Sequence, residues 1–123
     1  GAKADGDVEK AGTDNFFTIH YSAKTKIDAS SKTFEDGYAA SKRINMGGSS
    51  AVGATNKNVI EFTTAGAATL KIWWVSGGDG REIDIWNAEG TIIETTAVGS
   101  TKNALYISTI EIAEEGKYDL IKN

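Results

Sequence analysis

The fold is decided by residues 68–87, which read Ala-Thr-Leu-Lys-Ile-Trp-Trp-Val-Ser-Gly-Gly-Asp-Gly-Arg-Glu-Ile-Asp-Ile-Trp-Asn. Their first half alternates two sets of side chains, Leu70, Ile72 and Trp74 against Lys71, Trp73 and Val75. A period of two indicates a strand with one buried face, because successive side chains of a strand point to opposite sides. Residues 77–80, Gly-Gly-Asp-Gly, predict a tight turn, and residues 81–87 alternate again. The stretch therefore predicts two strands joined by a glycine turn.

Similar runs recur along the chain, at residues 16–21, 42–46, 58–64, 91–98, 105–112 and 117–121. Turn signals separate them at intervals of roughly 8–12 residues, which is typical of sandwiches and barrels. No stretch sustains a 3.6-residue period, and residues 38–42 are the only short helical candidate. Fourteen glycines and no proline suit β-strands joined by glycine turns. We therefore predict an all-β fold, an antiparallel β-sandwich of jelly-roll type.

The domain organisation follows from length and local composition. A chain of 123 residues suffices for one domain with a hydrophobic core. Residues 1–15 mix charged residues with glycine and alanine, so we expect a linker or a disordered N-terminus there, followed by a single β-sandwich module over residues 16–123. The chain begins with Gly-Ala and shows no signal peptide, so we expect a module cut from a larger protein. It has no long apolar run, so we expect this module to have no membrane partner.

Charge and residue inventory exclude several functional classes. The net charge of −4 argues against nucleic acid as a partner, because duplex binding requires a broad basic surface. Cysteine is absent, His20 is the only histidine, and no serine lies in a nucleophile-elbow motif. Asp79, Glu82 and Asp84 surround a glycine turn and suggest calcium, but an exposed acidic hairpin explains them better. We therefore predict no catalytic residue, no metal site and no cofactor.

Cations gather in two windows that contain no acidic residue. No Asp or Glu lies between Asp36 and Glu61, a window that holds Lys42, Arg43 and Lys57. The second window, residues 95–110, carries Lys102 as its only charge, whereas residues 79–94 hold five acids and one arginine. A partly dehydrated carboxylate requires a counter-charge with hydrogen-bond donors, which lysine supplies. The windows thus suggest a cleft for successive uronate carboxylates, with ordinary surface lysines as the alternative explanation.

Two tryptophans provide a second candidate site. Trp73 and Trp86 are out of phase with the apolar residues of their predicted strands. On consecutive strands of a hairpin they would lie side by side and form a platform for a neutral sugar ring. A covered cross-strand aromatic pair is the alternative. Acids close to Trp86 would repel an anionic glycan but not a neutral one.

Five motifs occur together in this chain: Lys-Thr-Phe-Glu-Asp-Gly-Tyr at 32–38, Arg-Ile-Asn-Met-Gly-Gly at 43–48, Lys-Asn-Val-Ile-Glu-Phe-Thr-Thr at 57–64, Ile-Trp-Trp-Val at 72–75 with Gly-Gly-Asp-Gly at 77–80, and Tyr-Ile-Ser-Thr at 106–109. The combination, over about residues 16–121, resembles the β-sandwich domains attached to bacterial pectate lyases, in particular carbohydrate-binding module family 77.

The resemblance implies a non-catalytic module that binds pectin, namely homogalacturonan with few methyl esters, through lysines. It implies Lys42, Lys57 and Lys102 as ligand contacts, and Arg43 replaces Lys42 if the strand register differs by one residue. It also implies a secreted, monomeric bacterial module attached to a catalytic module that degrades plant cell walls. The alternatives are a neutral β-glucan-binding module that uses the tryptophans, or a structural accessory domain of a polysaccharide lyase. We further expect the small residues 47–54 to let a glycan lie close.

Overall fold

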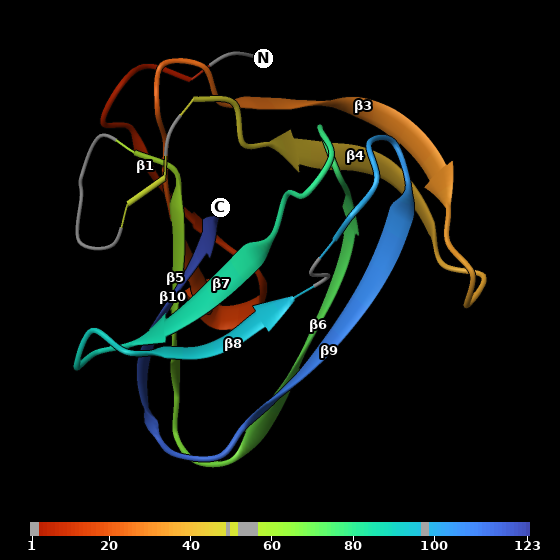
Figure 1. Ribbon diagram of the computed structural model, residues 1–123. Coiled ribbons are helices and arrows are strands. Elements are labelled where there is room, and N and C mark those ends of the chain that lie inside the picture. Colours follow the sequence, from red (N-terminus) through yellow and green to blue (C-terminus); the bar gives the residue numbers. More distant parts are fainter. Residues whose placement is uncertain (1–2, 49, 52–56, 97–98) are drawn as a thin grey trace.

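The computed structural model describes residues 3–48, 50–51, 57–96 and 99–123. Its described part folds into strands and one short 3-10 turn, η1 (Thr13–Asn15) (Figure 1). The strands are β1 (Val8–Ala11), β2 (Phe17–His20), β3 (Lys26–Thr33), β4 (Ala39–Asn45), β5 (Val59–Thr64), β6 (Ala68–Val75), β7 (Ile83–Asn87), β8 (Ile92–Thr96), β9 (Leu105–Ile112) and β10 (Gly116–Lys122).

The strands form two layers. The larger sheet has the order β1-β2-β5-β10-β7-β8, and every neighbouring pair is antiparallel. The antiparallel pair β6-β9 forms the second layer, and β3-β4 is a separate antiparallel hairpin. The predicted antiparallel β-sandwich is therefore confirmed, whereas the jelly-roll connectivity stays a prediction.

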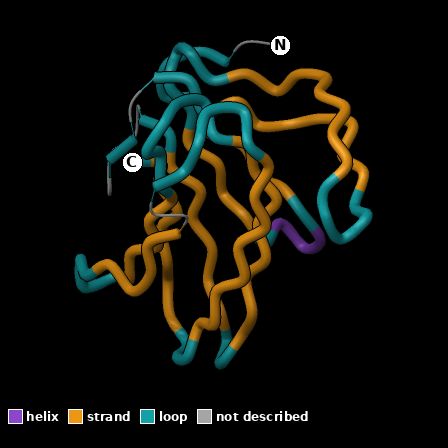
Figure 2. Tube along the Cα trace, turned by 45° about the vertical axis from the view of Figure 1, so that its right-hand side comes forward, coloured by secondary structure: helices purple, strands orange, loops and turns teal. Residues whose placement is uncertain are grey.

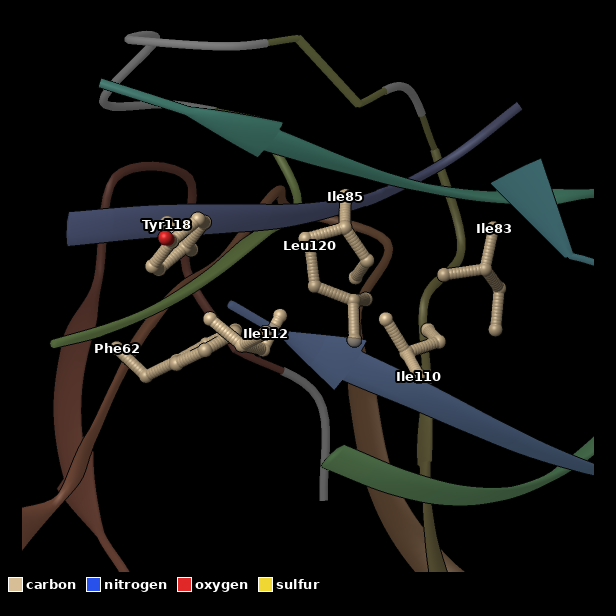
Figure 3. Packing of buried hydrophobic residues seen from close by; sticks show 7 residues of the cluster. All are labelled: Phe62, Ile83, Ile85, Ile110, Ile112, Tyr118 and Leu120. Atoms are coloured by element: carbon tan, nitrogen blue, oxygen red, sulfur yellow. The ribbon is translucent and has the colours of Figure 1, made fainter. Parts of the chain in front are cut away.

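The core lies between the large sheet and the β6-β9 pair. Ile85 from the large sheet is 0% exposed and Ile112 of β9 is 1% exposed. Figure 3 shows these two residues in one cluster with Phe62, Ile83, Ile110, Tyr118 and Leu120. Leu70, Ile72 and Trp74 pack against this cluster, so the predicted buried face of residues 68–76 is confirmed.

The two ends of the sandwich differ in their connections. Short turns at residues 65–67, 88–91 and 113–115 lie at one end, here called the turn end. At the other end β5, β7 and β9 begin and β6, β8 and β10 end. Figure 2 shows the longer loops gathered there, and Figure 1 shows the β3-β4 hairpin crossing the same end. We call it the hairpin end.

The β3-β4 hairpin is attached to the sandwich at its tip and at its base. At the tip, the Asp36 carboxylate accepts hydrogen bonds from Lys71 Nζ (3.1 Å) and Trp73 Nε1 (3.0 Å). At the base, the carbonyl oxygen of Gly47 accepts hydrogen bonds from Ser22 Oγ and Asn58 Nδ2, both at 2.6 Å. Among the described strands, β4 pairs only with β3.

Three local predictions need correction. The linker expected over residues 1–15 is wrong at β1, which pairs with β2 along its whole length because the edge of the large sheet offers free backbone groups. The set of expected strands is incomplete, because residues 26–33 form β3, which pairs with β4. Residues 39–42 are not helical but belong to β4. A turn at Asp36-Gly37 joins β3 to β4, with Gly37 at φ 90°.

Candidate functional site

A cleft of about 560 Å³ lies between β4 and the hairpin end of the sandwich. This volume falls within the range of ordinary small-ligand sites. Core side chains supply its apolar floor: Met46, Ile60, Ile72, Ile83 and Leu120. Cations supply much of its polar lining: Lys32, Lys42, Arg43, Arg81 and Lys122. We call it the hairpin cleft.

The hairpin cleft has a strong excess of positive charge. Among its described lining residues, Glu82 is the only acid beside the five cations. Only one of these cations, Arg43, has an ion-pair partner within the described part of the chain. Because the site is partly closed off from water, uncompensated cations favour a bound anion more than they would on an open surface.

Lys42 and Arg43 are neighbours on β4 but have different surroundings. Arg43 lies opposite Asp28 of β3 and donates to that carboxylate from Nε (2.7 Å) and an Nη atom (3.2 Å). This contact raises the pKa of Arg43 and lowers that of Asp28. Lys42 shares its side of β4 with Met46, which packs against the core. It is an exposed cation on the inner side of the hairpin, so Lys42 rather than Arg43 is available to a ligand.

Lys57 and Lys102 also lie at the hairpin end, but neither lines the hairpin cleft. Lys57 is partly buried and precedes Asn58, which holds the base of the hairpin through Gly47. Lys102 is exposed, and its backbone N–H donates to Asp79 Oδ1 at 2.9 Å. Its neighbour Asn103 does line the cleft. The structure thus places Lys42 inside the cleft and the other two predicted lysines near its end of the molecule.

Arg81 and Lys122 are cleft cations that sequence reasoning missed. Arg81 stands in the most acidic window of the chain, and Lys122 lies next to the C-terminal residue. Both join the site because β7 and β10 are paired, and the register places Lys122 opposite Ile83. This pairing register cannot be predicted from any local sequence pattern. The same holds for Lys32, which reaches the cleft through the pairing of β3 with β4.

The two tryptophans do not form a common platform. β6 pairs with β9, whereas β7 pairs with β10 and β8, so Trp73 and Trp86 belong to different sheets. Tyr38 covers Trp73 with its ring centroid 4.5 Å away, and Lys71 Nζ lies 4.9 Å from the Trp73 ring centroid. Trp86 lies opposite Asp119 and Ile92 on the outer side of the large sheet. The side-by-side arrangement expected from the sequence is therefore wrong.

The two glycines at the base of the hairpin are required by contacts within the protein. A Cβ at Gly47 would collide with the carbonyl oxygen of Lys24. At Gly48, where φ is 84°, a Cβ would lie 2.5 Å from Ser22 Oγ. Both neighbours belong to the loop that follows β2, so these small residues let the hairpin approach its own domain. Of the segment 47–54, which is expected to admit a glycan, residues 49 and 52–54 lie outside the described residues.

The acidic residues around the glycine turn at 77–80 do not converge. Asp84 is 3% exposed and accepts hydrogen bonds from Thr95 Oγ1 and Asn123 Nδ2. Asp79 instead accepts from the backbone of Lys102. In the part of the chain that the structure describes, no three His, Asp or Glu side chains are grouped closely enough to hold a metal ion. The described residues also contain no helix long and apolar enough to cross a membrane.

Comparison with known proteins adds no family to these observations. No protein-family model matches the chain. No curated protein sequence matches it either.

Proposed function

We propose that this protein is a non-catalytic carbohydrate-binding module that recognises pectin, specifically homogalacturonan with few methyl esters. One observation carries the proposal: in a protein whose net charge is −4, the described lining of the hairpin cleft holds five cations and one acid, and Asp28 pairs with only one of these cations, Arg43. Carboxylates of galacturonate residues are the groups that these cations would bind, as the resemblance to family 77 modules also implies. Lys42 is the contact that β4 contributes to the cleft, and Lys57 and Lys102 extend the positive surface beyond it.

The apolar floor of the hairpin cleft suits the rest of a uronate chain. A sugar ring presents C–H groups on its faces, and these pack on Ile72 and Met46 while the ring's carboxylate reaches the cations. Selectivity then comes from charge rather than from stacking on an exposed aromatic platform. The proposal includes secretion and attachment to a pectin-degrading catalytic module, which this module would hold on the plant cell wall.

Affinity gel electrophoresis against a panel of polysaccharides tests the proposal. We expect retardation by polygalacturonate, weaker retardation by highly methyl-esterified pectin, and none by cellulose derivatives or xyloglucan. Esterification removes the carboxylate charge, so affinity falls with each ester. Raising the salt concentration from 20 to 200 mM should weaken binding, because ions screen partly exposed charges. Retardation that is equal for both pectins and independent of salt would contradict an ionic mechanism.

The neutral-glucan alternative predicts a different result from the same gel. It requires Trp73 or Trp86 as a stacking surface. Trp73 is partly buried, packs against Tyr38 and lines the hairpin cleft, whereas Trp86 belongs to a different sheet. Retardation by xyloglucan that a Trp73→Ala substitution abolishes would favour this alternative over pectin.

A further inference from the structure

Arg81 and Lys122 form a pair of like charges that the fold holds together at the hairpin cleft. Lys122 lies directly opposite Ile83 in the antiparallel ladder of β10 and β7. Reciprocal backbone hydrogen bonds between Glu82 and Asn123, at 3.1 and 2.8 Å, extend this ladder by one residue pair. Arg81 is therefore the diagonal neighbour of Lys122 on the same face, at a spacing that long side chains bridge.

The segment that carries Arg81 is fixed by buried hydrogen bonds. Ser100 is 4% exposed, and its hydroxyl donates to the carbonyl oxygen of Arg81. Ser76, which is 1% exposed, lies 3.1 Å from the same hydroxyl and donates to the carbonyl oxygen of Gly78. Gly78 leaves room for the arginine, because a Cβ there would lie 3.0 Å from Arg81 Nε. The backbone at Arg81 is thus fixed by the fold, and Gly78 leaves space beside the guanidinium group.

The two charges lack a balancing acid. Within the described residues neither side chain has a carboxylate partner at ion-pair distance. Burial, and next the charge of Arg81, lowers the pKa of Lys122. Two cations held close together in a partly dehydrated site repel each other, and an anion between them removes that cost. The planar guanidinium group of an arginine such as Arg81 also matches the planar geometry of a carboxylate.

We propose that Arg81 and Lys122 together bind one carboxylate of a uronate chain and form the principal anion-binding subsite of the hairpin cleft. The inference rests on the proposed pectin-binding function and adds two residues that the sequence did not indicate. Lys42 then contacts a different carboxylate on the opposite wall, which β4 provides.

Calorimetric titration with an oligogalacturonate of defined length tests the subsite in the intact chain. We expect Arg81→Gln and Lys122→Gln each to raise Kd about tenfold or more, as for loss of a charge-assisted hydrogen bond. Lys122→Arg keeps the charge and should bind within about threefold of the wild type. Lys10→Gln is the matched control: it removes one positive charge from β1, outside the cleft, and should leave Kd nearly unchanged.

The double variant decides whether both residues bind the same carboxylate. For a shared carboxylate, the double variant should lose less binding free energy than the sum of the two single variants, because either substitution already removes most of the interaction. Fully additive losses of binding free energy would show that the two residues do not bind the same carboxylate. Thermal unfolding checks the fold, and Lys122→Gln should melt no lower than the wild type, because it relieves repulsion.

Failure of the subsite and failure of the function give different results. If the wild type binds oligogalacturonate and Lys42→Gln weakens binding while Arg81→Gln and Lys122→Gln do not, the subsite is wrong and the pectin-binding function stands. If the wild type shows no heat of binding and no retardation by polygalacturonate, the function and the subsite are both wrong.

Discussion

The two adjacent cations of β4 show how pairing alters the role of a residue. Arg43 is neutralised across the hairpin by Asp28, whereas Lys42 is exposed on the inner side of the strand. Sequence alternation puts them on opposite sides of β4 but does not reveal which side meets the ligand. Which of the two cations can meet a ligand depends on Asp28. Its strand, β3, could not be predicted because its sequence lacks alternating hydrophobic residues.

Lys42→Gln and Arg43→Gln therefore form a matched pair of substitutions. We expect Lys42→Gln to weaken oligogalacturonate binding about threefold to tenfold, the cost of one partly exposed ionic contact. Arg43→Gln should lower the melting temperature because the Asp28 contact is lost, and it should change Kd less than Lys42→Gln does. Calorimetry and thermal unfolding of both variants check this, and the reverse ranking in Kd would show that Arg43 is the ligand contact.

Asp119 provides a pH-dependent prediction on the outer side of the large sheet. Burial, followed by the negative charge of Glu61 in the opposite strand, raises its pKa, while Lys117 and His20 act in the other direction. A carboxyl group whose pKa is raised by folding stabilises the protein below its unfolded pKa, and this contribution is lost as pH rises through the folded value. Asp119→Asn should therefore be more stable than the wild type at pH 7.

Urea unfolding at several pH values measures this effect. The advantage of Asp119→Asn should shrink as the pH falls and disappear below about pH 3.9, the pKa of an unfolded aspartate. Asp5→Asn, at an exposed N-terminal position, serves as the control. A stability difference that is constant from pH 3 to pH 7 would show that the substitution acts through packing rather than charge.

At the scale of elements, the β3-β4 hairpin makes the hairpin cleft. Its tip is held by Asp36 and its base by Gly47, and the cleft lies under the span between them. No described strand other than β3 pairs with β4, so the position of β4 depends on these attachments. Loss of either attachment should move Lys42 relative to the cations of the sandwich.

Gly48→Ala tests the base of the hairpin. The substitution combines a positive φ with a Cβ that would lie 2.5 Å from Ser22 Oγ, so we expect a loss of about 2–3 kcal/mol in the free energy of unfolding. Gly90→Ala is the matched control, because its φ of 81° is similar but nothing lies within 4 Å of the added Cβ. It should cost about 1 kcal/mol. Equal losses in urea unfolding would indicate that backbone strain alone matters at Gly48.

Strand content could be predicted from the sequence where one face is buried. β5, β6, β7 and β9 place apolar residues at alternate positions because their inner faces meet in the core. β1 and β3 lack this pattern because most of their side chains are exposed on both faces. Backbone pairing with β2 and β4 holds them instead, and pairing partners leave no local signal.

At the scale of the whole molecule, cations gather in the hairpin cleft and acids gather in two turns of the opposite end. The turns at residues 88–91 and 113–115 contain Glu89, Glu114 and Glu115 and no cation, whereas the hairpin end carries the hairpin cleft with its lining of lysines and arginines. A field of this shape would orient an approaching polyanion toward the hairpin end. Sequence windows already suggest the separation, but they assign Arg81 to the acidic part because chain neighbours are not spatial neighbours.

The rigid base for this site is the core between the two layers. Ile85→Ala removes a side chain that is 0% exposed, so we expect a loss of about 2–5 kcal/mol in the free energy of unfolding. Ile92→Ala, at a position 43% exposed on β8, should cost less than about 1 kcal/mol. Urea unfolding compares the two, and similar losses would place the main core elsewhere.

Amide shift mapping by NMR tests the central claim most directly, because it reports both whether an anionic glycan binds and where. Titration of the labelled protein with de-esterified oligogalacturonate should shift amides of β4, of residues 76–82 and of the end of β10, which all border the hairpin cleft. The fully methyl-esterified oligomer should produce much smaller shifts. Absence of shifts with the acidic oligomer, or shifts confined to the turn end, would contradict the account.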